Sequence, residues 1–166
     1  DQVVLARTGE RFDRDGRLAR EGRVIALVLE GLLAHPYFEA PPPKSLDRYD
    51  FSPAPTEDLP LADAVATLTA FTAEAVARAF RHLDTRPASL IVTGGGRRNP
   101  ALMAALSARL SCTVTNVESV GWRGDALEAE AFAFLAARCL RGLPISFPGT
   151  TGVKAPMTGG RLTRPA

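Results

Sequence analysis

Three consecutive glycines, Gly94, Gly95 and Gly96, follow a short apolar run and precede an asparagine–proline pair. Because glycine has no Cβ, the backbone N–H groups of such a turn can point at an anion, and a ligand can approach the main chain closely. Asn99 is typical of a helix N-cap, and proline suits the first helical position, where its missing N–H is harmless. The pattern predicts a phosphate-binding turn between a buried strand and a helix.

Two other interpretations of this turn stay open on the residues alone. Glycine-rich turns also occur where a strand and a helix simply pack tightly, and short motifs often mislead. The turn lacks the Gly-Lys-Ser/Thr of a Walker P-loop. It is closer to the dinucleotide fingerprint, with Gly94, Gly96 and, about twenty residues on, Glu118 after a second predicted strand. However, Asn99 stands where that fingerprint has its third glycine.

The composition is that of an ordinary globular protein with a core of its own. Of the 166 residues, 46% are hydrophobic and 23% are charged, and the formal net charge is +2. Since the sequence has no lysine-rich run or basic-aromatic pattern, nucleic acid is not an expected partner. No apolar run reaches the roughly 20 residues that span a bilayer, and no signal-peptide layout is present.

The two cysteines, Cys112 and Cys139, lie far apart in sequence and lack metal-ligand spacing. Such cysteines are usually small core residues, so we expect no metal site and a reducing cytoplasm as the location. The chain starts at Asp1 rather than at a methionine. We therefore expect it to be a piece of a longer protein.

Apolar periodicity predicts a helix-rich α/β fold with a short parallel sheet flanked by helices. Helices are expected at residues 1–8, 17–34, 59–83, 100–110 and 126–141, and strands at 89–93 and 113–117. The first strand is a continuous apolar run, which is typical of a strand covered on both faces. Strand, helix and strand in this order form a βαβ unit.

Two loop regions complete the chain. Residues 36–55 are rich in proline and aromatic residues, so we expect an extended loop packed on the body rather than a linker. Its Lys44 and Arg48 fit either a phosphate or carboxylate contact or ordinary solvated charges. The tail at 146–166 is rich in glycine, threonine and proline, and we expect it to be irregular.

The acidic residues at the start of the last long helix have a structural explanation. Asp125 is expected to cap this helix, and Glu128 is the glutamate of a capping-box pattern. Both also complement the positive end of the helix dipole. On the residues alone, capping is therefore a sufficient reason for the pair.

Six motifs lie in order along nearly the whole chain: Phe12-Asp13-x-Asp15-Gly16, His35-Pro36-Tyr37-Phe38, Pro42-Pro43-Lys44-Ser45, Thr67-Leu68-Thr69, Thr93-Gly94-Gly95-Gly96-x-x-Asn99 and Asp125-x-x-Glu128-Ala129. Together they resemble one family, the anhydro-N-acetylmuramic acid kinases. The chain looks like the C-terminal part of such an enzyme. The resemblance implies part of an actin-like, ribonuclease H-like ATPase lobe, with helices and a proline-rich loop at 1–57, a nucleotide-side core at 58–145 and the tail at 146–166.

The resemblance also implies a function. Such enzymes use ATP and Mg²⁺ to convert 1,6-anhydro-N-acetylmuramic acid to N-acetylmuramic acid 6-phosphate with hydrolytic ring opening, in peptidoglycan recycling. The family's aspartate base lies upstream of Asp1, so this chain alone is expected to be inactive. The matching nucleotide-side residues are Gly94, Gly95, Gly96, Asn99, Lys44, Ser45 and Arg48, and the matching sugar-side residues are Glu128 and Asp125.

Two other function classes stay open beside the kinase. One is an NAD-dependent oxidoreductase fragment, in which Glu118 would bind the ribose hydroxyls. The other is a non-catalytic, sugar-kinase-like interaction module. For the kinase, the expected partners are ATP, the anhydro sugar and a missing N-terminal lobe. An open sheet edge invites pairing with a second copy, so a homodimer is also expected.

Overall fold

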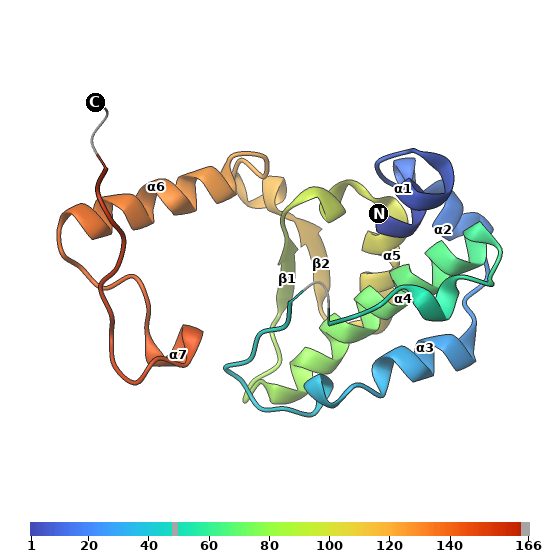
Figure 1. Cartoon of the computed structure of the whole chain (residues 1–166), viewed down its shortest axis with the longest axis horizontal. Helices are drawn as coiled ribbons and strands as arrows, with labels where there is room; N and C mark the ends of the chain where they lie inside the picture. The colour runs from blue at the N-terminus through green and yellow to red at the C-terminus, as the bar shows by residue number, and fades with distance from the viewer. Residues whose placement is uncertain (48–49, 164–166) are drawn as a thin grey trace.

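Helix α4 (Leu61–Ala79) is the longest helix and lies at the centre of a helix-rich α/β body (Figure 1). The computed structural model describes residues 1–47 and 50–163. The other α-helices are α1 (Gln2–Thr8), α2 (Arg17–Glu21), α3 (Ala26–Leu33), α5 (Pro100–Arg109), α6 (Leu127–Leu140) and α7 (Pro148–Thr151). Short 3₁₀-helices are η1 (Arg14–Gly16), η2 (Pro36–Phe38), η3 (Ala54–Thr56), η4 (Phe80–His82), η5 (Gly95–Arg98) and η6 (Val117–Val120). Helices α1, α2, α3 and α5 all pack on α4.

The predicted βαβ unit is confirmed. Strands β1 (Ser89–Val92) and β2 (Thr113–Asn116) are parallel, with Ser89 opposite Thr113, and α5 connects them. One face of this sheet packs on α4 and α5, where Leu90, Val92 and Val114 surround a buried cluster. That cluster consists of Ala73, Leu106 and Leu110.

The prediction that β1 is covered on both faces is wrong for the part of the chain that the structure describes. Exposure alternates along the strand, and Ile91 keeps 41% of its surface in solvent. Successive side chains of a strand point to opposite faces, so the helices on one face leave Ile91 open. The apolar run of β1 thus belongs to a sheet with one uncovered face.

The single helix expected over residues 17–34 is also wrong, because the structure has two helices there. Between α2 and α3 the chain is extended at Gly22 and crosses the first turn of α4, where a Cβ on Gly22 would overlap the carbonyl oxygen of Ala62. Side chains of α4 satisfy the freed N–H groups: Asp63 accepts from Arg23 at 2.7 Å and Thr67 from Ile25 at 3.0 Å. The close approach of two backbones therefore outweighs the helical periodicity.

The proline-rich loop packs on the body, as predicted. The ring of Phe51 lies 5.7 Å from that of Phe38 and 5.0 Å from that of Phe71 on α4. Phe38 is buried. Aromatic pairs at these distances stabilise a loop beyond the area they bury.

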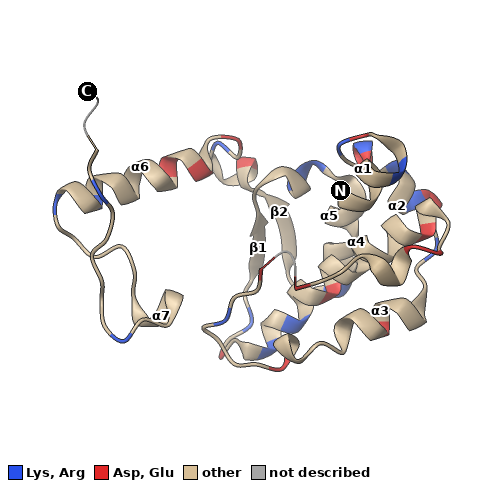
Figure 2. Cartoon of the chain, in the orientation of Figure 1, with Lys and Arg blue, Asp and Glu red and all other residues tan. Residues whose placement is uncertain are grey.

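Helix α6 and the tail extend away from the body in Figure 1. None of the residues of α6 is buried, and Phe132, Phe134 and Leu140 each keep more than 60% of their surface exposed. The tail, expected to be irregular, contains α7 and an antiparallel bridge between Ser146 and Met157. Lysine, arginine and acidic residues are spread over most elements (Figure 2). No described helix is long and apolar enough to cross a membrane.

A side chain at position 22 would force α2 and α3 away from α4. We expect Gly22→Ala to lower the free energy of unfolding by about 1–3 kcal/mol, measured by urea denaturation with circular dichroism. Gly31→Ala is the matched control, because Gly31 lies inside α3 with open space around its Cβ position. In the control, the free energy of unfolding is expected to rise by about 0.5–1 kcal/mol, because alanine favours a helix over glycine. Equal effects of the two substitutions would contradict the close approach at Gly22.

Candidate functional site

An open pocket of about 630 Å³ lies beside the glycine turn. Its walls come from α1, from the loop around η1, from one side of α4 and from the segment that joins η5 to α5. The polar lining residues include Asp13, Arg14, Asp15, Thr69, Thr72, Gly95, Gly96, Arg98 and Asn99. Segments that are up to about 100 residues apart in the sequence thus meet around one space.

The glycine turn leaves β1 through a left-handed residue and enters α5 through a complete N-cap. Gly94 has φ 74° and ψ −178°, a conformation that L side chains rarely adopt. A Cβ on Gly94 or Gly95 would meet open space, so the backbone there is accessible. Asn99 is the N-cap, as predicted: its Oδ1 accepts from the N–H groups of Ala101 and Leu102 at 3.0 and 3.1 Å.

The loop before α2 packs against the start of α5. A Cβ on Gly16, which has φ 66°, would overlap Asn99 and Ala101. The buried carboxylate of Asp13 accepts from the N–H groups of Leu18 and Ala19 at 2.9 and 3.0 Å and so fixes the start of α2. These contacts hold the η1 side of the pocket against the glycine turn.

Helix α1 packs on α4 and is also held by Arg7. Arg7 donates to the carbonyl oxygens of Leu59 at 2.8 Å and Thr56 at 2.7 Å, in the turn that precedes α4. Val3 and Val4 of α1 are buried, and both line the pocket. The position of this wall therefore depends on contacts far from the glycine turn.

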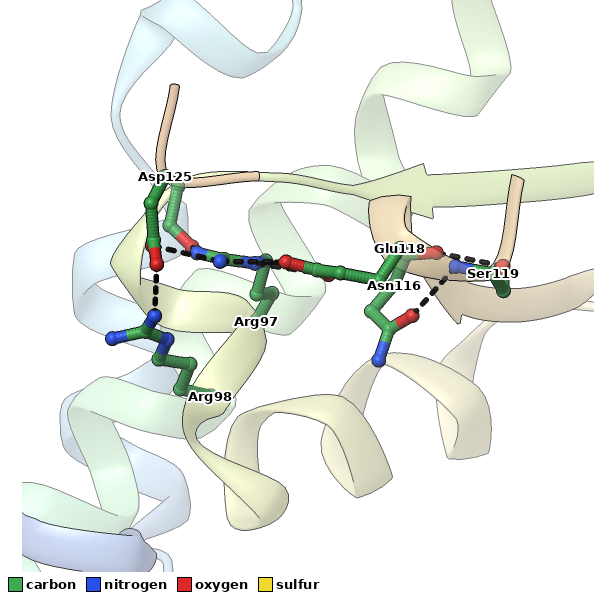
Figure 3. A network of polar contacts seen from close by, with 7 residues as sticks. Arg97, Arg98, Asn116, Glu118, Ser119 and Asp125 are labelled. Atoms are coloured by element: carbon green, nitrogen blue, oxygen red, sulfur yellow. Dashed lines mark hydrogen bonds and ion pairs between the residues drawn. The ribbon is translucent and has the colours of Figure 1, made fainter. Parts of the chain in front are cut away.

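Arg97 is the buried cation of the site (Figure 3). Its Nη1 donates to the carbonyl oxygen of Gly94 at 2.8 Å, and its Nε and Nη2 donate to Glu118 at 2.8 and 2.7 Å. Nη2 also donates to Asp125 at 2.8 Å. The N-cap Asn116, which accepts from Ser119 at 3.1 Å, fixes the η6 turn that carries Glu118. One guanidinium thus joins the glycine turn to the segment between β2 and α6.

These contacts shift the ionisation of all three groups. Hydrogen bonds to Glu118 and then to Asp125 raise the pKa of Arg97 above its ordinary value. The hydrogen bond from Arg97 is the largest cause that lowers the pKa of Glu118 and of Asp125 below their ordinary values. Both carboxyl groups are therefore held ionised at neutral pH.

Sequence reasoning missed both arginines of the glycine turn. Arg98 lines the pocket beside Gly95 and Gly96, and its guanidinium pairs with Asp125 at the pocket edge. Two arginines directly after a glycine run were a readable signal, since arginine binds phosphate and carboxylate groups with a planar fork of donors. The sequence does not show which way each side chain points. In the structure the Arg97 side chain points inward, whereas that of Arg98 is 65% exposed.

Lys44 lies in a different part of the structure. Its Nζ donates to the carbonyl oxygen of Tyr37 at 2.8 Å and lies 4.6 Å from the centre of that ring. It also lies 3.3 Å from Nε2 of His82 in η4. Lys44 therefore sits beside the segment that precedes β1, whereas Gly94 follows that strand.

The structure does not bring the predicted nucleotide-side residues together. Among the described residues that line the pocket are Gly95, Gly96 and Asn99, but neither Lys44 nor Ser45. Arg48 lies outside the described residues. The assignment of Lys44, Ser45 and Arg48 to nucleotide binding stays a prediction.

The capping prediction for Asp125 is wrong. The N-cap of α6 is Ala126, without a side-chain hydrogen bond, and Asp125 instead pairs with Arg97 and Arg98. The two arginines outcompete the helix end for this carboxylate because they carry full charges. Glu128 lies exposed in the first turn of α6 and does not line the pocket in the described part of the chain.

Comparison with known proteins decides the family. A family model described as anhydro-N-acetylmuramic acid kinase matches residues 1–165. The chain belongs to the anhydro-N-acetylmuramic acid kinase family.

Relatives in this family are markedly longer than the chain. An anhydro-N-acetylmuramic acid kinase of Phenylobacterium zucineum is 62% identical over 165 residues, covering 99% of this chain and 45% of the relative. One of Caulobacter vibrioides is 62% identical over 162 residues, covering 98% and 44%. One of Roseobacter denitrificans is 55% identical over 167 residues, covering 99% and 44%. The chain spans less than half the length of these curated relatives.

The NAD-dependent alternative is not favoured by these findings. The relatives are kinases by name. In addition, the Glu118 carboxylate, which the dinucleotide fingerprint would give to ribose hydroxyls, is bound by Arg97.

The lowered pKa values predict how stability depends on pH. The folded-state pKa values of Glu118 and Asp125 lie below their ordinary values of 4.5 and 3.8, so the folded chain binds these protons more weakly than the unfolded chain. Their stabilisation is complete above about pH 5 and is lost as the pH falls through the folded-state values. We expect the melting temperature of Glu118→Gln to lie below that of the wild type at pH 7, and the difference between the two to shrink as the pH falls below 4.5.

The control for this measurement is Glu21→Gln, which removes only the exposed pair of Arg17 and Glu21 on α2. Its melting temperature, followed by circular dichroism, should track the wild type across the range, since exposed pairs contribute little. A constant offset for Glu118→Gln at every pH would contradict the ionic role of Glu118.

Proposed function

We propose that this chain forms the nucleotide-side part of an ATP-dependent kinase that converts 1,6-anhydro-N-acetylmuramic acid to N-acetylmuramic acid 6-phosphate in peptidoglycan recycling. The observation that carries the proposal is the open glycine turn at the start of α5, on the wall of a pocket, in a chain matched over residues 1–165 by the family. The dipole of α5 favours an anion near the start of the helix. Because Asn99 already accepts from the N–H groups of Ala101 and Leu102, the donors for a phosphate would come from the glycine turn before the cap.

In the proposed reaction, O6 of the sugar takes the γ-phosphoryl group of ATP. Water adds to the anomeric carbon and breaks the 1,6-anhydro bond, and its proton passes to a carboxylate base. The products are the 6-phosphate and ADP. The family resemblance assigns the base to an aspartate outside this chain, so the residues described here bind and orient substrates rather than move the proton.

Each residue near the turn has a separate proposed role. Gly94, Gly95 and Gly96 present backbone N–H groups to phosphate oxygens, and Asn99 holds the helix start in position. Arg98 adds a positive charge on the pocket wall. Such fixed donors stabilise charge that develops on a transferring phosphoryl group.

Mg²⁺ would enter with the nucleotide, where it neutralises charge on the phosphates. Among the described residues, no group of three or more His, Cys, Asp or Glu side chains could hold a metal ion by itself. This composition fits a magnesium ion that keeps phosphate and water ligands.

The remaining predicted residues belong to the wider cleft of the longer enzyme. We assign Glu128 to the sugar side, with Asp125 beside it in sequence. Lys44, Ser45 and Arg48 are assigned to the nucleotide as the family motif implies. The helix-rich α/β body is proposed as part of an actin-like lobe, with residues 1–57, 58–145 and 146–166 as its loop, core and tail segments.

The chain alone is proposed to bind nucleotide without turning over the sugar, because the base and the second lobe belong to the further length of the relatives. The cytoplasm, where ATP is available, is the proposed location. A homodimer through the sheet edge is also proposed, since the two-stranded sheet has unpaired outer edges among the described residues.

Nucleotide binding by the chain tests the turn directly. We expect Gly95→Val to raise the Kd for Mg·ADP roughly tenfold or more by isothermal titration calorimetry, because the side chain fills the space a phosphate would take. Gly149→Val in α7 is the matched control: a Cβ there also meets open space, far along the chain from the turn. Equal Kd values for the two variants would overturn the assignment of the turn.

The sugar side is tested in a protein of the relatives' full length that contains this chain. We expect Glu128→Ala to lower kcat/KM for the anhydro sugar by a factor of about 100 or more in a coupled ADP-release assay. Glu130→Ala, two residues along the same helix turn, should leave kcat/KM nearly unchanged. An unchanged kcat/KM for Glu128→Ala would remove this residue from the site.

A further inference from the structure

The buried guanidinium of Arg97 joins its own glycine turn to two carboxylates of the segment between β2 and α6. Figure 3 shows its contacts with these two residues, Glu118 and Asp125. The guanidinium holds the Gly94 carbonyl oxygen at 2.8 Å, Glu118 after β2 at 2.7 Å and Asp125 before α6 at 2.8 Å. Arginine can make these contacts at once because it has five donors in a rigid plane. Lysine, with a single nitrogen on a flexible stem, lacks that geometry.

The entry to α6 is packed onto this guanidinium. A Cβ on Gly124 would lie 2.5 Å from Nε of Arg97 and from Oε1 of Glu118, so the loop backbone passes directly over the ion pair. Helix α6 itself has no buried residue in the described chain. The direction in which α6 leaves the body therefore depends heavily on Arg97 and its two carboxylates.

Asp125 is shared between the buried and the exposed arginine. It pairs with Arg97 on one oxygen and with Arg98 on the other, and Arg98 lines the pocket. An anion that enters the pocket competes with Asp125 for Arg98, because both are negative and Arg98 is 65% exposed. Loss of that pair leaves Asp125 held by Arg97 alone.

We propose that Arg97 is a positioning residue that couples the glycine turn to α6, so that nucleotide binding at the turn changes the setting of the loop that leads to Glu128. The inference rests on the proposed function, which supplies the nucleotide. Arg97 does not touch the ligand in this role. It transmits a movement of the Gly94 peptide to Asp125, three residues before Glu128.

The chain contains a natural reporter of this coupling. Trp122 is its only tryptophan, lies between Glu118 and Asp125 and is 57% exposed. In the wild type we expect Mg·ADP to change Trp122 fluorescence and to slow amide hydrogen exchange at residues 121–130. In Asp125→Asn, which keeps the shape and removes the charge, both responses should fall to roughly half or less, while the calorimetric Kd stays within about threefold.

Two variants separate coupling from mere stability. Glu130→Gln loses the ion pair of Arg123 and Glu130 on the same helix but leaves the link to the turn intact, so its responses should equal those of the wild type. Asp125→Glu keeps a carboxylate and should restore most of the response. A full Trp122 response in Asp125→Asn overturns the proposal.

Hydrogen exchange without nucleotide tests the link independently. Arg97→Lys and Asp125→Asn should speed exchange at residues 94–98 and at 121–130 together, whereas Glu130→Gln should affect only the second segment. Unchanged exchange at 94–98 in Asp125→Asn overturns the coupling. Absence of nucleotide binding by the wild type overturns the proposed function instead, and the ligand-free exchange then decides the link on its own.

Discussion

The close packing of helices on α4 is the constraint on which the rest of the structure depends. The buried face of α4 consists largely of small residues, among them Ala64, Ala66, Thr67, Ala70 and Ala73. Small side chains let neighbouring backbones approach closely, and each neighbour then gains many dispersion contacts. Helices α2 and α5 reach their positions in this way, and with them the two sides of the pocket.

Ion pairs, rather than apolar packing, hold the part of the chain that follows the β1–β2 sheet. Beyond the β1–β2 sheet the chain has few buried apolar residues, and the Arg97 guanidinium becomes the main tie between the glycine turn and α6. Its own side chain is 4% exposed, whereas Glu118 and Asp125 are 45% and 66% exposed. A buried cation is costly without its anionic partners, whereas a carboxylate near solvent can pair with water or with another cation. The junction is therefore anchored on a buried cation, while its two carboxylates stay accessible to solvent.

The exposed surface of α6 fits a chain that spans less than half the length of its curated relatives. Phe132 and Phe134 lie in solvent on a helix whose first turn carries Glu128. The glycine turn, by contrast, is fully supported by the residues of this chain, since Asn99 caps α5 and Gly16 packs against that cap. Nucleotide binding is therefore the part of the proposed function that the chain can be tested for by itself.

Much of the local structure and the resemblance to the family can be predicted from the sequence. The Asn99 cap, the βαβ order and the six family motifs depend on residues that are close together in the sequence, and local propensity is readable along the chain. Three features follow from tertiary packing instead: the helix breaks at Gly22, Asp125 pairs with Arg97 rather than capping α6, and Lys44 lies beside His82. Those outcomes depend on partners about 28 to 40 residues away, whose approach is set by packing and full charges rather than by periodicity.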